Sequence, residues 1–199
     1  MISFSLVYLG VFSLIISILS FFNIIYSYYF NLYLNVDNYF YTLLISLIIG
    51  LSSFYKIKKE TKISIYIKIF TVIIGYFLIP LVISIPFYFS IYNISFLNCY
   101  FESISGFTST GFTIFENIKH IDESLILWRS SSQWIGGIYF LFSIILLIDI
   151  FDDNLKKSLT NFITFNSTEI FKQSLKVLFL YIFLTFFIFI ILKIINIRT

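Results

Sequence analysis

The residues whose types and order suggest chemistry lie in one segment, Asn98 to Thr113, which reads NCYFESISGFTSTGFT. Hydroxyl side chains and two glycines are concentrated there, between long apolar runs. Asn98 to about Ser105 predicts two turns of amphipathic helix, and Gly106 is expected to end that helix in the left-handed conformation. A loop of small residues, Thr108 to Gly111, follows at once.

Such a loop suits the binding of a dehydrated cation. If the short helix enters a membrane from outside, its C-terminal end points inward, and the negative end of its dipole favours a cation there. Successive carbonyl oxygens of the loop can then replace a hydration shell, and potassium suits a carbonyl site. Gly111 adopts backbone angles closed to other residues, which allows close approach to an ion. Composition alone leaves a second interpretation open, an outer loop rich in turn-forming residues.

The rest of the chain consists of apolar elements that position this segment. Of 199 residues, 59% are hydrophobic and 12% charged, which excludes a water-soluble domain. A spanning helix needs about 20 apolar residues, so we expect an all-α integral membrane protein with about five transmembrane helices plus one re-entrant pore helix and filter loop. The expected spans cover residues 3–26, 39–55, 63–87, 125–148 and 177–192. Residues 89–117 are too polar for a single span and are expected to dip into the membrane and return.

Charge indicates topology and not a nucleic-acid partner, because the net charge is only +3 and lies in loops. The N-terminus lacks a basic start and a cleavage site, so it is expected to be a retained helix. A cytoplasmic N-terminus puts most basic residues on the cytoplasmic side. These are Lys56, Lys58, Lys59, Lys62, Lys68, Lys156, Lys157, Lys172 and Lys176.

Two charged residues and two glycines are expected to support the loop. A carboxylate inside a membrane needs a partner, so Glu102 is expected to bond either Arg129 or backbone amides behind the loop. Arg129 either pairs with Glu102 or extends outward to the interface. Gly136 and Gly137 weaken a helix interior by about 1 kcal/mol each, so we expect close packing against the pore helix, with a hinge as the alternative.

Other residues with chemical potential have plainer interpretations. His120 is the only histidine and is expected to be a solvated loop residue, and Cys99 the only cysteine, expected to pack. No disulfide framework is therefore possible within the chain. No catalytic constellation or phosphate loop is present in the sequence, so an enzyme is disfavoured and no cofactor is expected.

Phe101 to Thr113, followed at similar spacing by LWRSSSQWIGG from Leu127 to Gly137, resembles the first pore repeat of the Trk/Ktr-type potassium transporter subunits. The resemblance implies a transmembrane hairpin (1–55), an outer helix, pore loop and inner helix (56–150), a cytoplasmic connector (151–173) and the outer helix of an incomplete second repeat (174–199). It also implies that backbone carbonyls supply one quarter of a potassium filter. Those carbonyls belong to Thr108, Ser109, Thr110 and Gly111.

The function that the resemblance implies is potassium uptake across the cell membrane by a multi-pass, lipid-embedded chain, with potassium as the transported ion. One chain holds a single filter segment, so a closed pathway needs a homo-oligomer or chains that supply the missing repeats. A cytosolic nucleotide-binding regulatory subunit is also implied. Two alternatives stay open: a truncated or split N-terminal fragment that acts as a membrane assembly piece, and an unrelated membrane scaffold protein.

Overall fold

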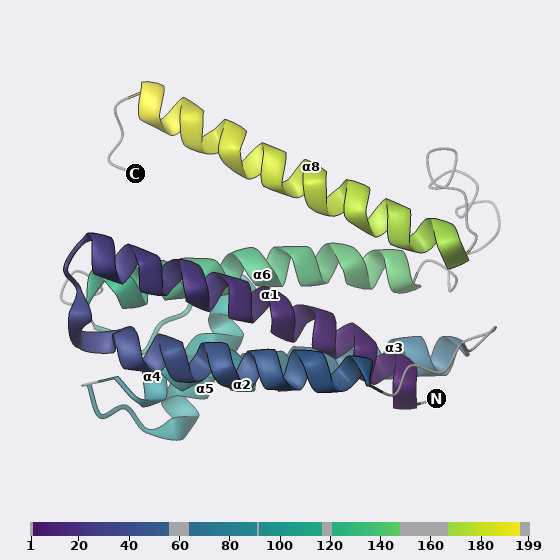
Figure 1. Cartoon of the computed structure of the whole chain (residues 1–199), viewed down its shortest axis with the longest axis horizontal. Coiled ribbons are helices and arrows are strands. Elements are labelled where there is room, and N and C mark those ends of the chain that lie inside the picture. The colour runs from purple at the N-terminus through teal and green to yellow at the C-terminus, as the bar shows by residue number, and fades with distance from the viewer. Residues whose placement is uncertain (1, 56–63, 91, 117–120, 148–166, 196–199) are drawn as a thin grey trace. The chain divides into compact units, whose positions relative to one another are not determined.

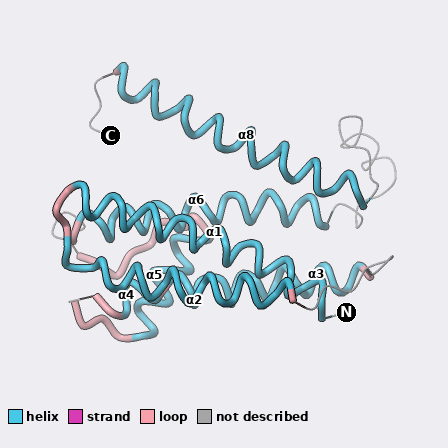
Figure 2. The backbone as a smooth tube through the Cα atoms, viewed as in Figure 1, coloured by secondary structure: helices cyan, strands magenta, loops and turns pink. Residues whose placement is uncertain are grey.

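The computed structural model describes residues 2–55, 64–90, 92–116, 121–147 and 167–195, which form two compact units, 1–139 and 140–199 (Figure 1). The described residues are helices and loops, without a strand among them (Figure 2). Among the described residues, five helices are long and apolar enough to cross a membrane, which confirms the predicted fold class of a multi-pass all-α membrane protein. These spans are Ser5–Tyr29, Tyr33–Phe54, Ile65–Tyr88, Glu123–Leu147 and Leu175–Ile194.

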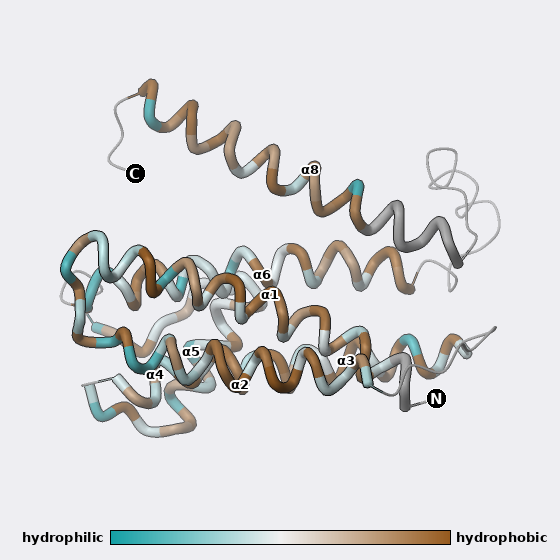
Figure 3. The backbone as a smooth tube through the Cα atoms, in the orientation of Figure 1, coloured by the Kyte–Doolittle hydropathy of each residue, from teal (hydrophilic) through white to brown (hydrophobic). Residues whose placement is uncertain are grey.

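The chain begins with an antiparallel hairpin of α1 (Ile2–Tyr29) and α2 (Val36–Phe54), joined by the short 3-10 helix η1 (Tyr33–Asn35). Small residues let the two helices approach closely, since a Cβ at Gly10 would overlap Ser53 and one at Gly50 would overlap Leu14. This close approach of small residues is typical of helix pairs in membranes. Figure 3 shows the apolar character of both helices, with more hydrophilic residues gathered toward the turn that joins them.

The next helix, α3 (Ile65–Ile83), runs into the one-turn α4 (Ile85–Tyr88). Pro80 lies inside α3, which ends three residues later, and Pro86 occupies the first turn of α4. A proline lacks the amide that a helix interior requires but is tolerated in a first turn. The two prolines therefore account for the break at Ser84.

The segment predicted to form the pore loop consists of α5 (Phe96–Phe107), a loop, and the start of α6 (Glu123–Leu147). Phe107 ends α5 beside Tyr76 and Gly136, which lie near the middles of α3 and α6. The chain then turns back, and the Asp122 amide donates to the Tyr92 hydroxyl at 2.9 Å, so both ends of the segment lie on one side. Helix α5 therefore ends level with the middles of α3 and α6, and the chain then returns to the side from which it came.

The second unit contains the end of α6 and helix α8 (Ser167–Ile194). The prediction of a helix over residues 177–192 is confirmed, but α8 begins ten residues earlier than expected (177 − 167). The predicted connector, 151–173, lies outside the described residues up to position 166, and its last part is helical.

Candidate filter site

The loop after α5 is closed by its own amides. Thr108, Ser109 and Thr110 donate to the carbonyls of Ile104, Gly106 and Ser105 at 2.8, 2.9 and 3.1 Å. These bonds satisfy the carbonyls that a helix C-terminus leaves without partners. The last turn of the pore helix and the start of the loop therefore form one hydrogen-bonded element.

The expectation that Gly106 ends the helix in the left-handed conformation is wrong. The helix continues through Phe107, and the left-handed residues are Ser109 (φ 56°) and Gly111 (φ 81°). Gly106 is instead a packing residue, because a Cβ there would overlap the Ser132 hydroxyl of α6.

The loop presents backbone oxygens at an exposed surface. Thr108, Ser109, Thr110 and Gly111 are all exposed, and within the described residues the first three carbonyls accept no hydrogen bond. The hydroxyls of Thr108 and Thr110 turn back toward the helix, donating to Ile104 and Ser105 carbonyls at 2.8 and 3.3 Å. The three main-chain carbonyls therefore offer unused electron pairs on this surface, in addition to those that the hydroxyl oxygens keep when they donate.

Glu102 and Arg129 are brought together behind the loop. The Arg129 Nε donates to Glu102 Oε1 at 2.5 Å, and the Glu102 side chain is completely buried while that of Arg129 is 14% exposed. The other oxygen, Oε2, accepts from the Ile114 amide at 3.0 Å, and the Thr113 hydroxyl donates to both oxygens at 3.1 and 3.2 Å. Both partner types expected for Glu102, Arg129 and a backbone amide, are present.

Arg129 also reaches the end of the loop itself. Its Nη2 donates to the carbonyls of Gly111 and Phe112 at 3.4 and 3.3 Å, and the Ser105 hydroxyl donates to Phe112 at 2.6 Å. One guanidinium thus joins the pore helix carboxylate to the returning chain. A buried carboxylate is stabilised only when charge and hydrogen bonds satisfy it. The Glu102–Arg129 pair therefore holds the returning chain against α5.

Gly136 lies directly against the last residue of the pore helix. A Cβ at this position would overlap the carbonyl oxygen of Phe107, so only glycine permits the observed distance between α6 and α5. Gly137 is half-buried beside it. The structure thus places one glycine of the pair at the packing contact.

Several residues that hold this site in place went unrecognised in the sequence. One of them is Asp122, whose main-chain carbonyl accepts from the Leu125 and Ile126 amides of α6 and whose carboxylate accepts from Asn35 Nδ2 at 2.5 Å and Ser124 Oγ at 2.7 Å. Aspartate immediately before a helix is a typical N-cap. The capping role of Asp122 could therefore be predicted from the sequence, but its hydrogen bond with Asn35 could not.

The remaining candidates contribute little to the site. Cys99 is buried, with its thiol 3.6 Å from the Ile94 carbonyl, which fits a packing role. His120 lies outside the described residues. Among the residues that the structure covers, no three His, Cys, Asp or Glu side chains are grouped as metal ligands would be.

Comparisons with known proteins point to cation transporters. No family profile and no solved structure matches the chain. The chain is 42% identical over 55 residues to an uncharacterized cation transporter, MJ1485, of Methanocaldococcus jannaschii, and 42% identical over 60 residues to the Trk system potassium uptake protein TrkI of Halomonas elongata. The matched segments make up 28% and 30% of this chain but only 12% and 11% of the two relatives. The resemblance to Trk-type transporters is thereby supported.

Proposed function

We propose that the chain forms part of a potassium uptake pathway and that its loop supplies one segment of the selectivity filter. The observation that carries the proposal is helix α5, which ends level with the middles of α3 and α6, followed by an exposed loop whose Thr108, Ser109 and Thr110 carbonyls accept no hydrogen bond within the described residues. Carbonyl oxygens in such a loop coordinate a dehydrated cation. The names of the two relatives, a cation transporter and a potassium uptake protein, agree with it.

The fourth ligand that we propose is the carbonyl of Gly111. This oxygen already accepts a long hydrogen bond from Arg129, 3.4 Å, but a carbonyl has two electron pairs and can also face an ion. Glu102 offsets the charge of Arg129, so the guanidinium does not leave a net positive charge behind the loop. In this proposal Glu102, Arg129, Gly136 and Gly137 position the loop and do not contact the ion.

A complete pathway requires further loops around the same axis. We propose that they come from additional copies of this chain or from chains that carry the missing repeats, with a nucleotide-binding regulatory subunit on the cytoplasmic face. With the N-terminus cytoplasmic, the loop opens outward and inward movement is driven by the membrane potential, which contributes about 2.3 kcal/mol per charge per 100 mV.

The test is rubidium uptake and growth at low potassium in a bacterial strain without its own potassium uptake systems. Uptake by the chain alone supports a homo-oligomer. Uptake only with a co-expressed chain that supplies further Ser/Thr-rich loops ending in Gly-Phe supports an assembly piece, the second function that the single loop favours. No uptake in either arm, with the protein present in the membrane, rejects both.

A matched pair of variants links uptake to the loop. Gly111→Ala is expected to abolish uptake or selectivity, because φ is 81° there. Asn93→Ala imposes a similar left-handed strain (φ 47°) at an exposed position before α5 and is expected to leave uptake unchanged. Equal losses of uptake in the two variants would show that the loss does not come from the filter loop.

A further inference from the structure

An aromatic cluster joins the N-terminal hairpin to the end of the pore helix. Its central residue, Tyr139 of α6, is fully buried. The Tyr139 ring lies 4.8 Å from Phe12 of α1 and 5.1 Å from Phe107 of α5, measured between ring centroids. Tyr76 of α3 completes the cluster at 4.8 Å from Tyr139 and 5.7 Å from Phe107. Four helices of the first unit therefore meet through aromatic rings.

The position of Tyr139 is fixed by its surroundings. Its hydroxyl donates to the Val72 carbonyl at 2.8 Å, and Gly75 leaves the space for it, because a Cβ there would overlap the Tyr139 hydroxyl. Phe12 packs edge-on against the ring at an interplanar angle of 70° and is itself fully buried. Together with Tyr8, whose ring centroid lies 5.8 Å from that of Tyr139, Phe12 covers the side of Tyr139 that faces the hairpin.

The other end of the cluster is the residue that precedes the filter loop. Phe107 is 1% exposed and is followed directly by Thr108, whose amide bonds back into the helix at 2.8 Å. Because Gly136 holds the backbone of Phe107 from a second side, a shift of its ring cannot be absorbed without moving the helix end.

The hairpin is also attached to the rest of the unit on both sides of the cluster. Toward the N-terminus, the hydroxyls of Ser5 and Thr71 are hydrogen-bonded at 2.6 Å. Toward the hairpin turn, Asn35 donates to Asp122 and the Tyr39 hydroxyl donates to Ser124 at 3.0 Å. The contact between Phe12 and Tyr139 thus lies in a firmly docked interface.

We propose that the hairpin is a positioning element for the filter loop and that Phe12 acts on the loop through Tyr139 and Phe107. The consequence for ion selectivity rests on the proposed function, but the mechanical coupling does not. Phe12 contacts the Tyr139 ring, and Tyr139 contacts Phe107, the residue before the loop, so the cluster forms a continuous path of packed rings from the hairpin to the loop.

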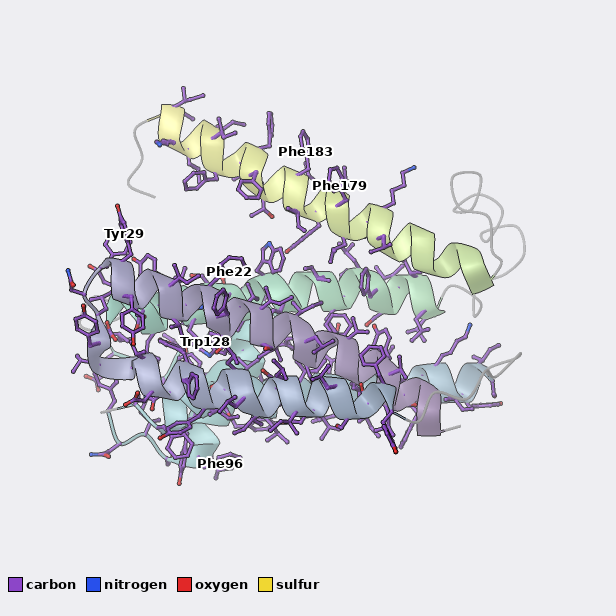
Figure 4. The ribbon with its side chains drawn as sticks, in the orientation of Figure 1. Phe22, Tyr29, Phe96, Trp128, Phe179 and Phe183 are labelled. Carbon is purple, nitrogen blue, oxygen red and sulfur yellow. The ribbon has the colours of Figure 1, made fainter. Side chains whose placement is uncertain are left out.

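Amide hydrogen exchange in the purified full chain tests the coupling without requiring transport. Phe12→Ala is expected to speed exchange at Thr108, Ser109 and Thr110 at least tenfold while amides in the middle of α2 keep their rates. The control is Phe22→Ala on the same helix, because Phe22 is 57% exposed (Figure 4) and should leave loop exchange unchanged. If Phe12→Ala does not yield folded protein, Phe12→Leu keeps apolar volume and removes only the ring.

Unchanged loop exchange in a folded Phe12 variant, or a uniform rise across all helices, overturns the proposal. A second measurement, the ratio of rubidium to sodium uptake, is expected to fall at least threefold in Phe12→Leu and to stay constant in Phe22→Leu. Faster loop exchange with no uptake by any form of the protein, including the unmodified chain, would uphold the coupling and reject the proposed transport function.

Discussion

Gly111 in the loop and Gly136 in α6 are the same residue type in two regions that require it for opposite reasons. Gly111 has a φ of 81°, and no atom of the described residues lies within 4 Å of the position that a Cβ would occupy. Gly136 is helical, and a Cβ there would overlap backbone atoms of Phe107. One glycine serves the conformation of its own chain, and the other serves the packing of a neighbour.

The difference separates the shape of the loop from its location. The loop is shaped locally, by left-handed residues and by hydrogen bonds to the last turn of α5. Its depth is set by α6, which holds the end of α5 through Gly136 and the returning chain through Arg129. Substitutions in α6 should therefore lower the stability of the protein, whereas substitutions in the loop should mainly lower its transport function.

The largest effect is expected for Gly136→Ala. Because the new methyl group meets backbone and not the end of a side chain, the helices must separate, at a cost of about 3 kcal/mol or more. Thermal unfolding in detergent, followed by circular dichroism, measures this. Ser130→Ala, on an exposed face of the same helix, is the control and should unfold as the unmodified protein does. An unchanged melting temperature for Gly136→Ala would contradict the packing described for α6.

The next largest effect is expected for Glu102→Gln. The amide leaves Arg129 without its counter-charge in a mostly buried site, which costs about 2–3 kcal/mol after allowance for the partial exposure of Arg129. Removing both charges in Glu102→Gln with Arg129→Gln should recover part of that loss. Glu116→Gln, an exposed carboxylate after the loop, should have no effect. Additive losses in the double variant would show that the two residues do not act as a pair.

The features that sequence predicted are those with a strong local cause. Apolar runs of about 20 residues have few alternatives to a spanning helix, and residues 89–117 are too polar to form one. Glu102 and Arg129 could be paired in advance because a charge in an apolar segment must find a partner. The sequence spacing of Glu102 and Arg129 contributed less to this prediction than the free-energy cost of leaving either charge unpaired in a membrane.

The features that sequence did not predict depend on contacts between distant segments. Asn35 and Asp122 are 87 positions apart, and no local pattern links them. The aromatic cluster around Tyr139 was equally hidden, because 22% of the chain is aromatic and no single ring stands out. Gly106 was assigned to a left-handed helix end, although α6 packing explains it and Ser109 takes that conformation instead.

An intermediate effect on stability is expected for Gly111→Ala. The left-handed conformation costs an alanine about 1–2 kcal/mol, with no overlap to add to it. The loss of rubidium uptake should be large, and the fall in the melting temperature should be small. Gly111→Asn is the informative comparison, because asparagine adopts positive φ more readily and should retain more uptake than alanine. A loss of stability as large as that of Gly136→Ala would erase the distinction between loop and packing glycines.

The smallest effect is expected for Gly106→Ala. Gly106 is a packing glycine like Gly136, but its neighbour is a side chain and not a backbone. Its Cβ would overlap only the hydroxyl of Ser132, which can rotate, and the alanine gains about 1 kcal/mol of helix propensity. The net loss should therefore stay below about 1 kcal/mol, and Ser132→Ala should reverse it, since the serine Cβ lies 3.4 Å away, an ordinary contact. The same Ser132→Ala substitution should not rescue Gly136→Ala, whose obstacle is the backbone of Phe107. Rescue of both would mean that α5 and α6 can slide past each other, and the depth of the loop would then have to be set elsewhere.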